Sequence, residues 1–91
     1  MKRFVIEREM PAVGTLEREQ MRAAAEKSNS VLRELGPDIQ WMESHVTRDK
    51  IYCVYLAKDA ALIRKHAEMS GFPANRISEV KRTIDPTTAA S

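Results

Sequence analysis

The run Ile51-Tyr52-Cys53-Val54-Tyr55-Leu56 places the strongest constraint on how this chain can fold. It is rich in β-branched and aromatic residues, which favour a strand. Successive side chains of a strand point to opposite faces, and here both faces are apolar. We therefore expect this strand to lie in a sheet that has helices over one face and some other cover over the second face.

A second strand precedes this run and completes a hairpin. Residues 39–46 alternate loosely between apolar and polar, and residues 47–50 form a polar turn. If the turn has two central residues, His45 pairs with Tyr52 across the hairpin. This register places four side chains on one face of the sheet: Trp41, Glu43, His45 and Tyr52.

Two amphipathic helices flank the hairpin. The first is predicted within residues 15–35, where apolar residues recur at steps of three and four and Thr15 with the glutamates after it suggests a capping box. Gly36-Pro37 ends this helix. The second helix is predicted over residues 60–70, with Asp59 as its N-cap.

Shorter strand patterns at residues 4–9 and 77–84 complete the order strand, helix, strand, strand, helix, strand. This order predicts an α+β fold, a ferredoxin-like β-α-β-β-α-β sandwich in which both helices cover one face of an antiparallel sheet. A second copy of the chain is the simplest cover for the open face, so we expect a homodimer. Residues 1–84 should form one domain, and the small polar residues 85–91 a flexible C-terminal tail.

The length and charge of the chain exclude several classes of protein. Ninety-one residues build one domain with a thin core. The net charge is +2, and the basic residues are scattered rather than clustered, which argues against a nucleic-acid partner. No apolar run approaches the roughly 20 residues of a membrane span, and charge comes too early for a signal peptide. We expect a cytoplasmic protein with no membrane partner, in agreement with its single cysteine, Cys53.

Glu43 and His45 are the first candidate metal ligands. Two residues apart on a strand, their side chains lie on the same side and can meet at one ion. His66 is the third candidate, although its place on the second helix, after Leu62 and Ile63, equally suits a packed core histidine. The pair itself has an alternative interpretation as a polar contact at a sheet edge. Tight ligand spacings such as C-x-x-C are absent from the sequence.

An aromatic cavity is the second candidate site. In a dimer, the space between two facing sheets would be lined by Trp41, Tyr52, Tyr55 and Cys53 and could bind a small molecule, with or without turnover. The same residues also suit core or dimer packing, and Cys53 suits a buried small hydrophobe. The sequence carries no Ser-His-Asp pattern, phosphate loop or dinucleotide fingerprint, so it favours a binding role over an enzymatic one.

Several segments resemble a family of small bacterial domains of unknown function that includes an actinobacterial nickel-binding protein. These segments are residues 34–41 (ELGPDIQW), residues 46–55 (VTRDKIYCVY), His66-Ala67, residues 71–80 (GFPANRISEV) and residues 85–88 (DPTT). The resemblance implies a ferredoxin-like dimer with nickel at the dimer surface. It implies that Glu43, His45 and His66 are ligands of nickel or another divalent transition metal. His66 matches a position of the family.

Overall fold

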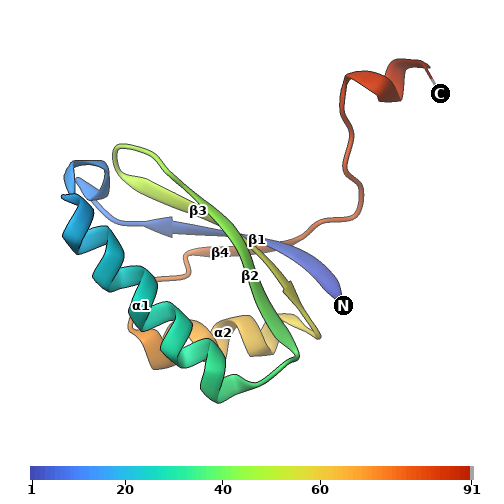
Figure 1. The fold of residues 1–91 in the computed structure, drawn as a ribbon. Helices are drawn as coiled ribbons and strands as arrows, with labels where there is room; N and C mark the ends of the chain where they lie inside the picture. The colour runs from blue at the N-terminus through green and yellow to red at the C-terminus, as the bar shows by residue number, and fades with distance from the viewer. Residues whose placement is uncertain (91) are drawn as a thin grey trace.

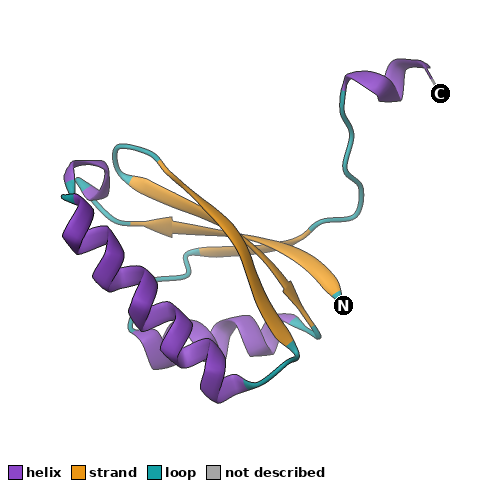
Figure 2. Cartoon of the chain, viewed as in Figure 1, coloured by secondary structure: helices purple, strands orange, loops and turns teal. Residues whose placement is uncertain are grey.

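The computed structural model describes residues 1–90 and confirms the α+β, ferredoxin-like fold. Its elements are β1 (Lys2–Glu9), the 3₁₀ helix η1 (Val13–Thr15), α1 (Arg18–Leu35), β2 (Ile39–Val46), β3 (Lys50–Ala57), α2 (Ala60–Ser70), β4 (Arg76–Glu79) and the 3₁₀ helix η2 (Pro86–Ala90). The strands form one antiparallel sheet in the order β2-β3-β1-β4. Both α-helices pack on the same face of this sheet (Figures 1 and 2).

The helix boundaries follow from local capping. Asp59 caps α2 as predicted, because its side chain accepts a hydrogen bond from the Leu62 backbone N–H at 2.9 Å. The start of α1 differs from the prediction. The Thr15 hydroxyl donates to the Ala12 carbonyl at 2.7 Å and closes η1, and Glu17 with Gln20 forms the capping box two residues further on.

The last strand is shorter than the predicted residues 77–84. The pairing of β4 with β1 runs from Arg76 to Glu79 and stops there. The backbone N–H of Val80 adds one more hydrogen bond, at 2.8 Å, to the carbonyl of Arg3. β1 begins at Lys2, so the residues that follow Val80 have almost no strand left to pair with. The chain then leaves the sheet and ends in η2, away from the body of the domain (Figure 1). Ser91 lies outside the described residues, and the flexibility predicted for residues 85–91 stays a prediction.

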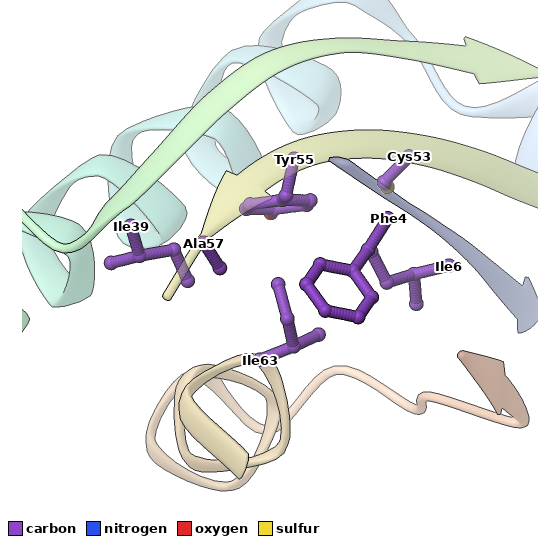
Figure 3. Packing of buried hydrophobic residues seen from close by; sticks show 7 residues of the cluster. All are labelled: Phe4, Ile6, Ile39, Cys53, Tyr55, Ala57 and Ile63. Atoms are coloured by element: carbon purple, nitrogen blue, oxygen red, sulfur yellow. The ribbon is translucent and has the colours of Figure 1, made fainter. Parts of the chain in front are cut away.

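The core lies between the helices and the sheet face that they cover. Side chains from three strands and α2 converge there (Figure 3): Phe4, Ile6, Ile39, Cys53, Tyr55, Ala57 and Ile63. Within residues 1–90, no helix covers the opposite face, where Val5, Tyr52, Val54 and Leu56 are half-buried. None of the helices in this part of the chain combines the length and apolar character that a membrane span requires.

Candidate functional site

A β-bulge at Met42 divides β2 into two parts that present their side chains differently. Trp41 pairs with Tyr55, but the next paired residue is Glu43, which lies opposite Val54. The extra residue reverses the alternation. Trp41 therefore faces the helices, and Glu43 faces the open side of the sheet. The prediction that Trp41 shares a face with Glu43 and His45 is wrong, because it assumed a strand without a bulge.

Glu43 and His45 lie together on the open face, and the predicted hairpin register is confirmed, with His45 opposite Tyr52. The Nε2 atom of His45 lies 2.5 Å from Oε2 of Glu43. Their side chains are 63% and 60% exposed, so the pair is accessible from solvent. An imidazole nitrogen and a carboxylate oxygen within this distance offer two ligands to one metal ion.

His66 lies on the other side of the sheet, on α2, and is fully buried. Its Nε2 lies 3.2 Å from the Ser28 hydroxyl on α1, and its Nδ1 has no hydrogen-bond partner among residues 1–90. Its ring is tilted against that of Tyr55, with 5.4 Å between the centroids. Burial lowers the pKa of His66, and the positive charge of Arg8 lowers it further, so the imidazole is held in its neutral form. His66 is a packed core residue that does not meet the Glu43–His45 pair.

The donor set of one chain is too small for a closed metal site. Across residues 1–90, no three His, Cys, Asp or Glu side chains come together in a way that could hold a metal ion. Glu43 and His45 supply two donors, whereas structural transition-metal sites usually have four or more. Within one chain, the pair therefore supplies fewer donors than a closed metal site needs.

The four residues of the predicted aromatic cavity do not surround one space within a chain. Trp41, Cys53 and Tyr55 line a cavity of about 250 Å³, but this cavity lies between α1 and the sheet. Tyr52 points to the open face of the sheet instead. Burial raises the pKa of the Tyr55 phenol, so its hydroxyl stays protonated near neutral pH.

Two polar residues that line this cavity, Arg8 and Ser44, were not among the residues predicted for it. Arg8 donates from Nε to the Cys53 sulfur at 3.4 Å, and Ser44 donates to the same sulfur at 3.0 Å. Ser44 in turn accepts from the Trp41 indole N–H at 2.9 Å. The available signal was the alternation of the first strand, in which Arg8 follows Phe4 and Ile6 on the core face.

Comparisons with known proteins agree with this fold. The crystal structure of SCO4226 from Streptomyces coelicolor A3(2) superimposes with a TM-score of 0.76, at 18% sequence identity, over 90% of this chain and 99% of that chain. No curated protein matches the chain. The family model described as "Nickel responsive protein SCO4226-like" matches residues 4–80. The chain therefore belongs to the SCO4226-like family of nickel responsive proteins.

Proposed function

We propose that this protein binds nickel as a homodimer, at the Glu43–His45 pair on the open face of the sheet. The 2.5 Å contact between His45 Nε2 and Glu43 Oε2, on two side chains that are more than half exposed, carries this proposal. The description of the family as nickel responsive gives the preferred ion.

The donor chemistry suits the ion. Imidazole binds nickel well, and tetragonal arrangements of nitrogen and oxygen donors are typical of Ni²⁺ and Cu²⁺. One chain supplies one imidazole and one carboxylate. If the pairs of two copies meet at one ion, they supply two imidazoles and two carboxylates. If each pair binds its own ion, water molecules complete the coordination shell.

The open face of the sheet supports the dimer. Val5, Val54 and Leu56 form a half-buried apolar centre there, with Tyr52 beside it. The Glu7–Lys50 ion pair, with 2.6 Å between Oε1 and Nζ, lies beside this centre. An apolar centre bordered by charged groups is the usual anatomy of a protein interface. Since β2 presents Glu43 and His45 on this same face, a second copy would bring further donors near the pair.

Calorimetric titration of the metal-stripped, tag-free protein with Ni²⁺ tests the metal site. We expect saturable binding that is lost in His45→Gln and weakened at least tenfold in Glu43→Gln. Glu26→Gln is the matched control, because Glu26 is a similarly exposed carboxylate on α1 that pairs with Arg22. Equal nickel affinity in all four proteins would refute the site.

A further inference from the structure

The cavity of about 250 Å³ between α1 and the sheet is open because α1 carries small side chains there. Ala24, Ala25 and Ser28 line it at positions where larger residues would fill the space. Much of the remaining lining is apolar, with Met21 on α1 and Trp41 on β2. Protein interiors are packed tightly, so an apolar hollow of this size is a candidate ligand site.

Arg8 brings a buried positive charge to this hollow. Its side chain lines the cavity, and the residue is only 2% exposed. Nη1 donates to the Pro73 carbonyl at 2.7 Å, Nε donates to the Cys53 sulfur at 3.4 Å, and the Phe72 ring lies 5.9 Å from the guanidinium carbon. Nη2 is buried and has no hydrogen-bond partner among residues 1–90. One strong donor of the guanidinium is therefore left unsatisfied.

The charge of Arg8 also has no counter-charge nearby. In the described part of the chain, no aspartate or glutamate lines the cavity, and no ion pair of Arg8 is present. The Tyr55 hydroxyl stays protonated, so it supplies no negative charge. A buried cation without a partner is unfavourable because its desolvation is not offset. A carboxylate would supply both the missing acceptor and the missing charge.

We propose that this cavity binds a small organic monocarboxylate, with its carboxylate on Arg8 and its apolar body between α1 and Trp41. The volume is somewhat below the roughly 300–1,000 Å³ of pockets that hold drug-sized ligands, so short acids such as octanoate and phenylacetate suit it. The site is separate from the proposed nickel site, because the sheet lies between Arg8 and the Glu43–His45 pair.

Trp41, the single tryptophan of the chain, reports on the cavity through its fluorescence. Metal-free protein is titrated with sodium octanoate, with phenylacetate and with 1-octanol, which has the same chain length as octanoate but no charge. We expect a saturable change with the acids and at least tenfold weaker binding of 1-octanol. The absence of a saturable response to both acids, or equal affinity for octanoate and 1-octanol, overturns the proposal.

Two variants locate the binding. Arg8→Met should weaken octanoate at least tenfold while leaving 1-octanol nearly unchanged, since it removes the charge and keeps an apolar side chain. Ala24→Phe should fill the hollow and abolish octanoate binding, whereas Ala23→Phe, on the exposed side of the same helix, should leave it intact. If Arg8→Met fails to fold, the Ala24 and Ala23 variants still show whether octanoate binds in this cavity. Unchanged octanoate affinity in folded Ala24→Phe contradicts the assignment.

Discussion

Ser28 of α1 and His66 of α2 meet in the core, with 3.2 Å between the serine hydroxyl and Nε2 of the histidine. This contact joins the two helices under the sheet, where both residues are almost fully buried. A charged imidazole at this place would lose its hydration and would lie near the positive charge of Arg8. The folded protein therefore holds His66 in its neutral form.

The stability of the protein should fall as the pH drops below about 6.5. The folded state lowers the pKa of His66 below its ordinary value of 6.5, so the unfolded chain binds a proton more readily in the interval beneath that value. The contribution of neutral His66 to the free energy of unfolding is fully present above pH 6.5 and is lost as the pH falls toward the pKa of His66 in the folded state. Thermal unfolding between pH 7.5 and 5.5 measures this decline.

His66→Gln should flatten this decline, because glutamine does not titrate. His45→Gln should retain it, since that change leaves the buried histidine in place. The pKa values of Glu7 and Glu79 are lowered from their ordinary 4.5, so these carboxylates change stability only below that pH and not between pH 7.5 and 5.5. An equally steep decline in His66→Gln would show that another group is responsible.

Deletion of Met42 should unfold the protein or destabilise it by several kcal/mol. Without the bulged residue, one part of β2 must turn its side chains to the opposite face, which exposes Trp41 or buries the Glu43–His45 pair. Met42→Ala is the control, because the Met42 side chain is exposed and the bulge is kept. We expect its free energy of unfolding to stay within about 0.5 kcal/mol of wild type. Similar stability of the deletion and the wild type in urea unfolding would contradict the role given to the bulge.

Gly14→Ala should destabilise the protein by about 1–3 kcal/mol through overpacking. A Cβ atom at Gly14 would lie 2.7 Å from the Thr47 carbonyl oxygen and 2.9 Å from the Arg48 Cα, both of which belong to the backbone of the β2–β3 turn. Ala12→Gly is the reverse control. Ala12 has a positive φ of 61°, so glycine relieves strain there, and we expect stability within about 1 kcal/mol of wild type. Urea unfolding of both variants measures the difference, and an unaffected Gly14→Ala would refute the close approach.

Val54→Glu should convert the proposed dimer to a monomer. Val54 lies at the centre of the open face, and a glutamate in a dimer interface would be buried without a partner. Ala61→Glu, on an exposed position of α2, is the control and should leave the mass unchanged. Sedimentation equilibrium gives the mass of each variant. A wild-type protein that is already monomeric at all concentrations would refute the dimer.

The sequence predicted the parts of the fold that depend on local patterns. α2 was predicted at residues 60–70, where it is found, and the hairpin register was correct at His45 and Tyr52. Asp59 marks the start of α2, Gly71 and Pro73 mark its end, and the polar turn sets the hairpin register. The orientation of His66 toward the apolar side of α2 followed from the helical period.

The features that the sequence did not predict depend on tertiary contacts. The bulge at Met42 has no glycine or proline to mark it, and it alone decides which face Trp41 occupies. The burial of Arg8 was also missed, because an arginine in a first strand resembles a solvated edge residue until the carbonyl of Pro73 and the ring of Phe72 are placed around it. Because of the bulge, Trp41 lines the cavity on the helix-covered face of the sheet and not the open face where the aromatic site was expected.

The location of bound nickel distinguishes the exposed Glu43–His45 pair from the buried His66. Amide signals of ¹⁵N-labelled protein are followed by NMR as Ni²⁺ is added to the metal-stripped sample. We expect signals around Glu43, His45 and the facing Tyr52 to shift or broaden first, while those of Ser28 and His66 stay unchanged until the site is saturated. First effects centred on His66, or no effect at stoichiometric nickel, would contradict this expectation.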